Sequence, residues 1–199
     1  MSTSLKGVSS LKLHRDLGIT QKSAWHFAHR LRKAWETEHG LFSGPVEIDE
    51  TYIGGKERNK YKSKKLNPGS VPVGKTAIVG ARDRETGKAT AQPVFTDKPA
   101  LHAFIEAHTE PATTVYTDDA RVYESMPRFR RAVKHSDGEY VVDDTSANRI
   151  EIPWAILKRG MYGVYHHMSN KYLHRYTTEF SGSHNDCPAD TLDQVHGLI

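Results

Sequence analysis

The order of β-rich and helical segments between residues 46 and 160 most constrains what this chain can fold into. Alternating apolar and polar residues predict strands, and apolar residues spaced about three to four apart predict helices. On these patterns the predicted order is β-β-β-α-β-α-β-α, over residues 46–53, 75–82, 88–95, 99–108, 113–118, 120–125, 129–134 and 148–160. Three consecutive strands followed by alternating helices and strands indicate an α/β domain with a mixed sheet flanked by helices.

A small helical segment precedes this domain. Residues 9–17 and 20–35 have the pattern of two helices with Gly18 in the turn between them, and Thr20 is a suitable N-cap for the second. One face of the second helix is apolar, with Ala24, Phe27, Ala28 and Leu31, and the other is basic, with Lys22, His26, Arg30, Arg32 and Lys33. This pattern is typical of a helix-turn-helix that binds DNA, although an ordinary helical hairpin with a solvated basic face fits it equally well.

A second group of basic residues follows the first predicted strand. It consists of Lys56, Arg58, Lys60, Lys62, Lys64 and Lys65. By itself such a run is usually a solvated loop. The formal net charge of +4 and the twelve histidines favour a polyanionic partner, so we expect this loop and the basic helix to contact DNA.

The composition also bears on the compartment. No apolar run approaches the length of a membrane span, and the first residues lack the apolar stretch of a secretory signal. The single cysteine cannot form an internal disulfide or a thiolate zinc site. We therefore expect a cytoplasmic, nucleoid-associated protein that has no membrane partner.

Three acidic residues occupy meaningful places in the predicted order. Asp49 lies inside the first strand, Asp118 ends the fourth, and Glu151 lies in the first turns of the last helix. If the first and fourth strands are neighbours, their carboxylates converge, and a helix packed across them adds the third. Oxygen ligands suit Mg²⁺ or Mn²⁺, and two such ions about 3.5 to 4 Å apart catalyse in-line displacement at phosphate. The sequence therefore predicts metal-dependent phosphoryl transfer.

Lys158 strengthens this prediction. It lies seven positions after Glu151, nearly two helical turns, and so shares its face with Glu151. Asn148 lies one turn earlier, where we expect a contact with DNA. Each of these residues alone has an ordinary structural explanation. Asp118 could be a turn residue, Glu151 and Lys158 a solvent-exposed ion pair on a helix, and Asp49 a charged residue on an edge strand. Asp119 replaces Asp118 in the site if the fourth strand ends one residue later.

The motifs around these residues resemble those of the Asp-Asp-Glu insertion-sequence transposases in which a helix-turn-helix precedes the catalytic core. They cover most of the chain and lie in residues 46–55, 73–80, 115–120, 154–160, 165–169 and 172–180. The resemblance implies an RNase H-like fold, magnesium-dependent cleavage at terminal inverted repeats, strand transfer into target DNA, and work as a homo-oligomer on two transposon ends. It matches Asp49, Asp118 and Glu151 to the catalytic, metal-binding acids and Lys158 to the accompanying base.

The same resemblance predicts the domain organisation. We expect a partial helix-turn-helix in residues 1–40, an RNase H-like catalytic domain in residues 44–182, and an irregular tail in residues 183–199. Compared with the family, the chain looks truncated at both ends, and its one cysteine excludes the zinc ribbon with which similar members often start.

Two other functions fit part of the sequence. A catalytically inactive remnant or domesticated DNA-binding protein would use the basic helix and loop without the carboxylates. A cellular RNase H-like nuclease fits the acids but explains neither the helix-turn-helix nor the motif in residues 172–180. The prediction is therefore the transposase of a prokaryotic insertion sequence, with the DNA-binding protein as the alternative.

Overall fold

The computed structural model describes residues 6–36, 40–54, 61–65, 75–118, 123–126, 128–133, 141–142, 145–146 and 150–186. Several predictions fall outside these residues, namely those for Lys56, Arg58, Lys60, Asn148 and residues 187–199. Half of the helix predicted over residues 120–125, residues 120–122, also lies outside them.

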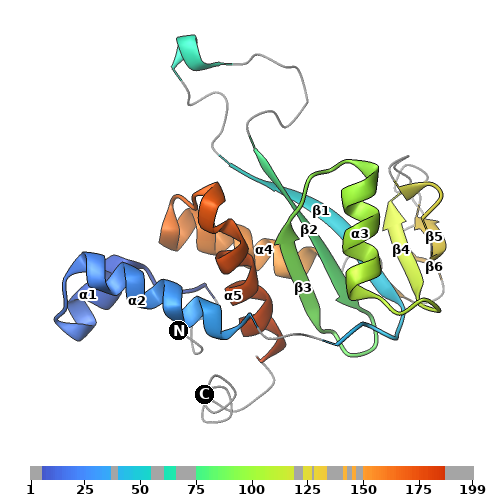
Figure 1. Cartoon of the computed structure of the whole chain (residues 1–199), viewed down its shortest axis with the longest axis horizontal. Coiled ribbons are helices and arrows are strands. Elements are labelled where there is room, and N and C mark those ends of the chain that lie inside the picture. Colours follow the sequence, from blue (N-terminus) through green and yellow to red (C-terminus); the bar gives the residue numbers. More distant parts are fainter. Residues whose placement is uncertain are drawn as a thin grey trace.

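Five strands of the described chain form one mixed sheet in the order β3-β2-β1-β4-β5 (Figure 1). They are β1 (Val46–Ile53), β2 (Thr76–Asp83), β3 (Ala89–Pro93), β4 (Thr114–Asp118) and β5 (Phe129–Val133). β1, β2 and β3 are antiparallel neighbours, whereas β4 runs parallel to β1 and to β5. The predicted α/β fold with a mixed, RNase H-like sheet is therefore confirmed.

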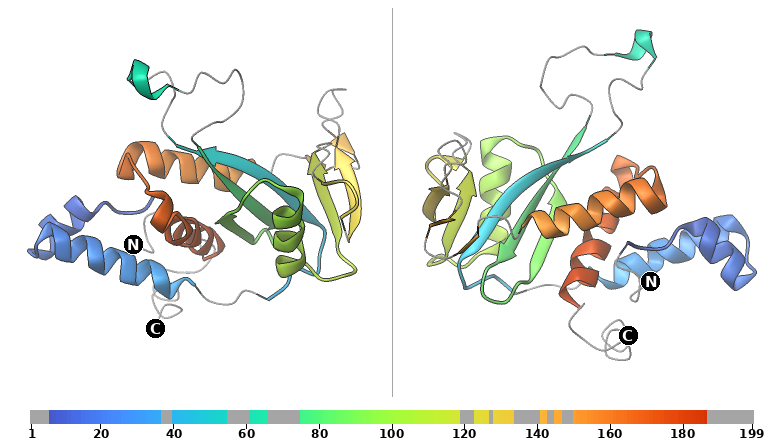
Figure 2. Two further views of the ribbon diagram at one scale, coloured as in Figure 1. Left: turned by 45° about the horizontal axis from the view of Figure 1, so that its top comes forward. Right: turned by 180° about the vertical axis from the view of Figure 1, so that it is seen from behind.

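Helices cover both faces of this sheet (Figures 1 and 2). α3 (Lys98–His108) packs on one face, where Leu101 and Phe104 join the buried side chains of the sheet. α4 (Glu151–Gly160) and α5 (Leu173–Asn185) pack on the other, in a second buried cluster. The central strand β1 is thus covered from both sides, as is usual for strands in α/β sheets.

Alternation along β1 separates two sets of side chains. Val46 and Ile48 belong to the cluster under α3, while Ile53 belongs to the cluster under α4 and α5. Residues two apart on a strand share a face, so Glu47 and Asp49 lie on the face of Ile53. A covered central strand normally carries apolar residues on both faces. Acidic residues on this face therefore indicate a functional site.

The N-terminal segment forms the two predicted helices, α1 (Ser10–Leu17) and α2 (Gln21–Ala34). Thr20 caps α2 as predicted, because its side chain accepts a hydrogen bond from the Ser23 N–H. Phe27 was expected on the buried face but is 43% exposed. The short helix α1 contains no buried residue, so the two helices enclose little apolar surface between them.

The chain after Lys158 is more helical than predicted. α4 continues into a π-helical turn (Met161–Tyr165), and a short 3-10 turn (Asn170–Tyr172) leads into α5. We expected an irregular tail from residue 183, but α5 continues to Asn185. The reason is a pair of side-chain hydrogen bonds. Asn185 Nδ2 donates to the Ala89 carbonyl (2.9 Å), and Asn185 Oδ1 accepts from the Ala89 N–H (2.8 Å), which fixes the end of α5 to the edge strand β3.

A short hairpin was not predicted at all. β6 (Val141–Val142) pairs with β7 (Thr145–Ser146) as a separate two-stranded sheet. Strands of two residues are too short to produce a detectable alternation of apolar and polar side chains. Within the described part of the chain, no helix has the length and hydropathy needed to cross a membrane.

Candidate active site

The pairing of β1 with β4 brings together the two strands that carry Asp49 and Asp118. The parallel register joins Val46 to Val115 and Glu47 to Tyr116. Asp49 and Asp118 each lie two positions beyond the last paired residues, Glu47 and Tyr116, on these two neighbouring strands. Adjacent strands lie about 4.8 Å apart, and residues in register share a face of the sheet. The sequence-based expectation that the first and fourth strands are neighbours is confirmed, although the Asp118 side chain is outside the described side chains.

The start of α4 is fixed to β1 beside these residues. The backbone N–H of Ile150 donates to Glu47 Oε2 (3.2 Å), and Glu47 Oε1 forms an ion pair with Arg84 Nε (3.1 Å). Glu151, the first residue of α4, follows directly and is exposed. The helix thus begins over the face of β1 that carries Asp49, which is the placement that the third acid requires. Glu47 and Arg84 were missed by the sequence analysis because a buried ion pair has no local sequence signature.

Asp49 itself is held by α4. The indole N–H of Trp154 donates to Asp49 Oδ2 at 2.9 Å. Trp154 is buried, with 5% of its surface exposed. Its ring lies against Gly80, which is the cross-strand partner of Asp49 in β2. A side chain at Gly80 would overlap the indole ring, so the missing Cβ is what allows Trp154 to reach the carboxylate.

The remaining site residues face solvent. Lys158 is exposed in the last turn of α4, two turns beyond Glu151, which is also exposed. Among the described side chains, from which Asp118 is missing, no cluster of three or more His, Cys, Asp or Glu has the geometry of a metal site. The three predicted ligands, Asp49, Asp118 and Glu151, would offer only carboxylate oxygens. Such donors fit hard divalent cations such as Mg²⁺ and Mn²⁺.

A second acidic residue of β1 is tied to the opposite side of the sheet. Tyr123 is fully buried among the residues under α3, and its hydroxyl donates to Glu50 Oε1. Glu50 follows Asp49 in the chain and therefore lies on the other face of the strand. Glu50 thus has a structural role and is separate from the candidate metal ligands.

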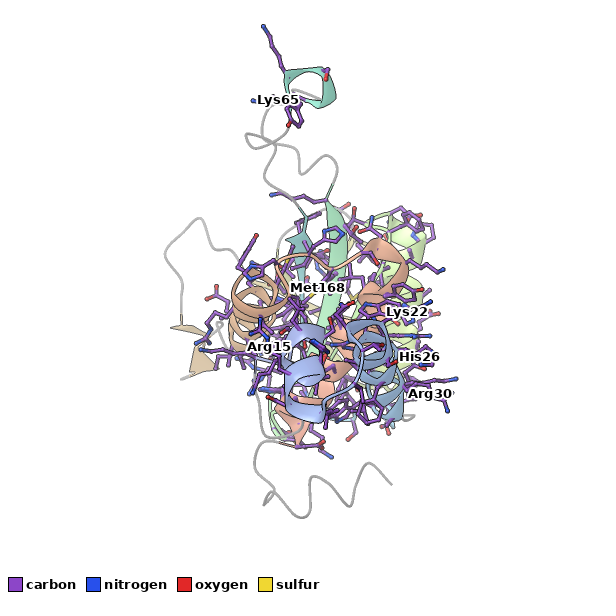
Figure 3. All side chains as sticks on the ribbon, turned by 90° about the vertical axis from the view of Figure 1, so that its left-hand side faces the viewer. Arg15, Lys22, His26, Arg30, Lys65 and Met168 are labelled. Carbon is purple, nitrogen blue, oxygen red and sulfur yellow. The ribbon has the colours of Figure 1, made fainter. Side chains whose placement is uncertain are left out.

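The basic residues of α2 form a continuous face. Lys22, His26 and Arg30 are exposed and follow one another down one side of the helix (Figure 3). Lys33 is also exposed. From the second basic segment, the short turn Lys62–Lys64 stands away from the body of the molecule, beyond the ends of β1 and β2 (Figures 1 and 2). Lys62 is exposed and Lys65 is partly exposed there, while the Lys64 side chain lies outside the described side chains.

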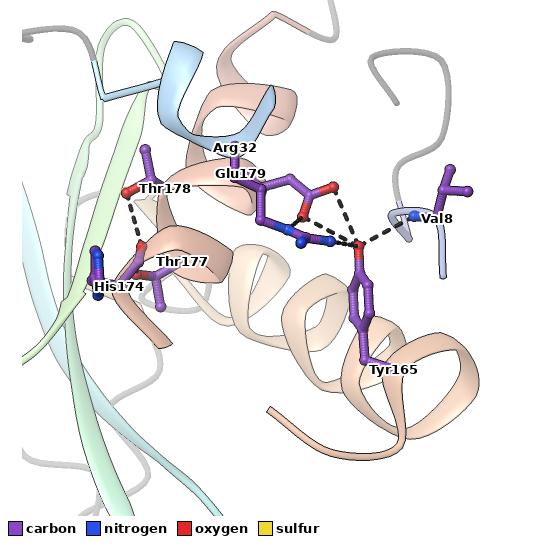
Figure 4. A network of polar contacts seen from close by, with 7 residues as sticks. All are labelled: Val8, Arg32, Tyr165, His174, Thr177, Thr178 and Glu179. Carbon is purple, nitrogen blue, oxygen red and sulfur yellow. Dashed lines mark hydrogen bonds and ion pairs between the residues drawn. The ribbon is translucent and has the colours of Figure 1, made fainter. Parts of the chain in front are cut away.

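Arg32 was predicted as a DNA contact, and this prediction is wrong. Its side chain is only 2% exposed and forms an ion pair with Glu179 of α5, Nε to Oε2 at 2.7 Å (Figure 4). The guanidinium also lies over the Tyr176 ring, 4.3 Å from its centroid. A partner 147 residues away in the sequence decides the burial of Arg32, so the helical pattern of α2 alone could not reveal it.

Tyr165 completes a buried polar network around this ion pair (Figure 4). Its hydroxyl donates to the Glu179 carboxylate, at 3.1 Å from Oε2, and accepts from the Val8 N–H at 3.2 Å and from Arg32 Nη2 at 3.3 Å. Burial raises the pKa of Tyr165, so the hydroxyl keeps its proton and remains a donor at neutral pH. The network joins the N-terminal helices to the end of α4 and to α5.

His29 lies beside this network on the same face of α2. It is 2% exposed and packs against Trp25, Tyr172 and Tyr176. Burial lowers the pKa of His29 to about 4, and nearby cations including Arg32 act in the same direction. The ring is therefore neutral at pH 7. The face of α2 toward α5 thus holds a neutral histidine and a paired arginine, while the opposite face presents unburied cations.

Two comparisons with known proteins agree with this geometry. A family model described as the ISXO2-like transposase domain matches residues 41–181. A protein of Halobacterium salinarum, described as an uncharacterized protein in the transposable element ISH50, is 27% identical over 161 residues. The match covers 74% of this chain and 55% of that protein, so the chain spans about half the length of this curated relative.

Proposed function

Because this chain belongs to the ISXO2-like transposase family, we propose that it cleaves DNA at the terminal inverted repeats of a prokaryotic insertion sequence and transfers the ends into target DNA. The observation that supports this chemistry most is the parallel pairing of β1 with β4, the strands that carry Asp49 and Asp118, beneath the helix that begins with Glu151. Transfer of two ends also requires the chain to act as a homo-oligomer on DNA.

In this proposal Asp49, Asp118 and Glu151 hold two Mg²⁺ or Mn²⁺ ions. Bound divalent ions of this kind supply Lewis-acid charge for an in-line displacement at phosphorus. The carboxylates compensate that charge and fix the cations relative to the sheet. Lys158, exposed on the same helix as Glu151, contacts a phosphate near the scissile bond and holds the DNA in place.

The basic face of α2 is the proposed DNA-binding surface. Lys22, His26, Arg30 and Lys33 are exposed along it, and a helix with such a face fits the major groove. Lys62 and Lys65 lie apart from this face, beyond the ends of β1 and β2. They are available there to contact a second stretch of the DNA backbone. Contacts between these cations and DNA phosphates do not depend on the base sequence. They therefore contribute to DNA affinity more than to sequence specificity.

Neutralising one residue of this face is expected to weaken DNA binding in a salt-dependent way. Lys22→Ala or Arg30→Ala each removes one phosphate contact, so the slope of log affinity against log salt should fall in magnitude by about 1. Fluorescence anisotropy with a labelled duplex, over a series of salt concentrations, measures this slope. Lys98→Ala, at an exposed position of α3, is the control. Equal slopes for all three variants would show that α2 does not contact DNA.

The test of the proposed activity is cleavage of a duplex that carries the element's terminal repeat, with Mg²⁺ or Mn²⁺ and with a chelator. Metal-dependent cleavage supports the transposase. A DNA-binding protein without catalysis is the second candidate, because the basic face of α2 is separate from the carboxylates. Salt-sensitive binding without cleavage would favour this second candidate.

A further inference from the structure

The indole ring of Trp154 links two of the proposed metal ligands. Trp154 lies three residues after Glu151, on the same side of α4, and its N–H donates to Asp49 Oδ2 at 2.9 Å. A hydrogen bond to an ionised carboxylate is among the stronger kinds in proteins. One turn of α4 therefore carries Glu151 and also fixes the side chain of Asp49 on a different element.

The ring that carries this N–H is closely packed on several sides. Trp154 is 5% exposed and packs in the buried cluster with Ile78, Ile150 and Leu157. On the side toward β2 it occupies the space above Gly80, where no Cβ is present. The start of α4 is fixed as well, by the bond from the Ile150 N–H to Glu47. A donor that cannot move restricts the carboxylate it binds to one rotation.

We propose that Trp154 is a positioning residue, which orients the Asp49 carboxylate for divalent metal ions, and that Gly80 is required because it admits the indole ring. The proposal rests on the proposed function, since it assumes that Asp49 is a metal ligand. Groups that bond to a metal ligand from outside the coordination shell typically change metal affinity by about 10- to 100-fold when they are removed. Trp154 thus acts on the metal through Asp49 and does not touch it.

The first experiment compares two tryptophans that make the same kind of bond. Trp154→Phe keeps a buried aromatic ring but removes the N–H donor. Trp35→Phe is the matched control, because Trp35 Nε1 donates to the carboxylate of Asp186 at 3.2 Å, away from the candidate site. Mn²⁺ binding is measured by the electron paramagnetic resonance of the free ion, without DNA and without turnover. We expect Trp154→Phe to weaken Mn²⁺ binding at least about 10-fold and Trp35→Phe to leave it unchanged.

A second pair of variants tests the role of Gly80 and does not depend on the folding of Trp154→Phe. Gly80→Ala introduces a Cβ that overlaps the ring of Trp154, so the ring must move away from Asp49. Gly182→Ala is the control, since its Cβ overlaps the ring of Trp35 in the same manner. We expect only Gly80→Ala to weaken Mn²⁺ binding, even if thermal unfolding shows that both variants lose similar stability.

The Asp49→Asn variant distinguishes failure of the proposed metal site from failure of the positioning role of Trp154. If the native chain binds Mn²⁺ and Asp49→Asn does not, Asp49 is a ligand, and native-like binding by Trp154→Phe and Gly80→Ala then overturns the positioning role alone. If Asp49→Asn binds Mn²⁺ as the native chain does, the proposed metal site is wrong and the positioning role falls with it. Equal weakening by Trp154→Phe and Trp35→Phe would also overturn the inference, because it would reflect a general loss of structure.

Discussion

Glu179→Gln is expected to lower the free energy of unfolding by about 3 to 5 kcal/mol, because it leaves the charge of Arg32 buried and unpaired. Both side chains of this ion pair are almost inaccessible to water, at 2% for Arg32 and 3% for Glu179. Water therefore cannot compensate the guanidinium when the carboxylate is lost. The glutamine of this variant keeps only one oxygen, so Arg32 and Tyr165 must share one acceptor in place of two, and the bond that joins the π-helical turn to this network weakens.

Two further variants identify the cause of this loss. Asp16→Asn breaks an exposed ion pair of similar length, Lys12 to Asp16 at 2.8 Å, and should cost only about 0.3 to 0.5 kcal/mol. The double variant Arg32→Met with Glu179→Met removes both charges and should recover most of the stability. Urea unfolding followed by circular dichroism measures all of them. A cost for Glu179→Gln no larger than that for Asp16→Asn would mean that this ion pair does not hold the N-terminal helices to α5.

Asp49→Asn is expected to reduce DNA cleavage by about 1000-fold or more while DNA binding stays nearly unchanged. The substitution keeps the shape of the side chain and an oxygen for the Trp154 N–H, but it removes a negative charge that compensates the metal. Metal ions contribute several kcal/mol to such reactions, and each 1.36 kcal/mol is a factor of ten in rate. The proposed DNA-binding face on α2 does not include Asp49, so affinity for the duplex should persist.

Single-turnover cleavage and anisotropy on the same duplex measure the two effects separately. Asp118→Asn should behave in the same way, since Asp118 is a proposed ligand of the same metal ions and ends the strand that pairs with β1. Glu50→Gln is the matched control, because Glu50 belongs to the same strand and is bonded to Tyr123. Loss of binding in parallel with loss of cleavage would contradict the separation of the metal site from the DNA-binding surface.

Strong local patterns explain what the sequence could predict. β1 and α2 were placed within one or two residues of their actual ends, because alternation and an N-cap at Thr20 mark them. The convergence of Asp49 and Asp118 was predicted on the condition that the first and fourth strands are neighbours. The pairing of β1 with β4 meets that condition.

The features that could not be predicted depend on distant partners. Arg32 has the spacing of a surface residue, and only Glu179 explains why it is buried. Asn185 extends α5 because its side chain bonds to the backbone N–H and C=O of Ala89, which lies in the edge strand β3. The bond from Trp154 to Asp49 depends on Gly80, which lies in another strand. Spacing within one element does not contain such information.

The most direct test of the proposed transposase is nicking of a labelled terminal-repeat duplex by the native chain and by Glu151→Gln, each with Mg²⁺ or Mn²⁺. The account predicts metal-dependent nicking by the native chain and none by the variant, with equal DNA binding by both. Nicking that persists in Glu151→Gln, or a native chain that binds the duplex and never nicks it, would contradict the proposed catalytic site.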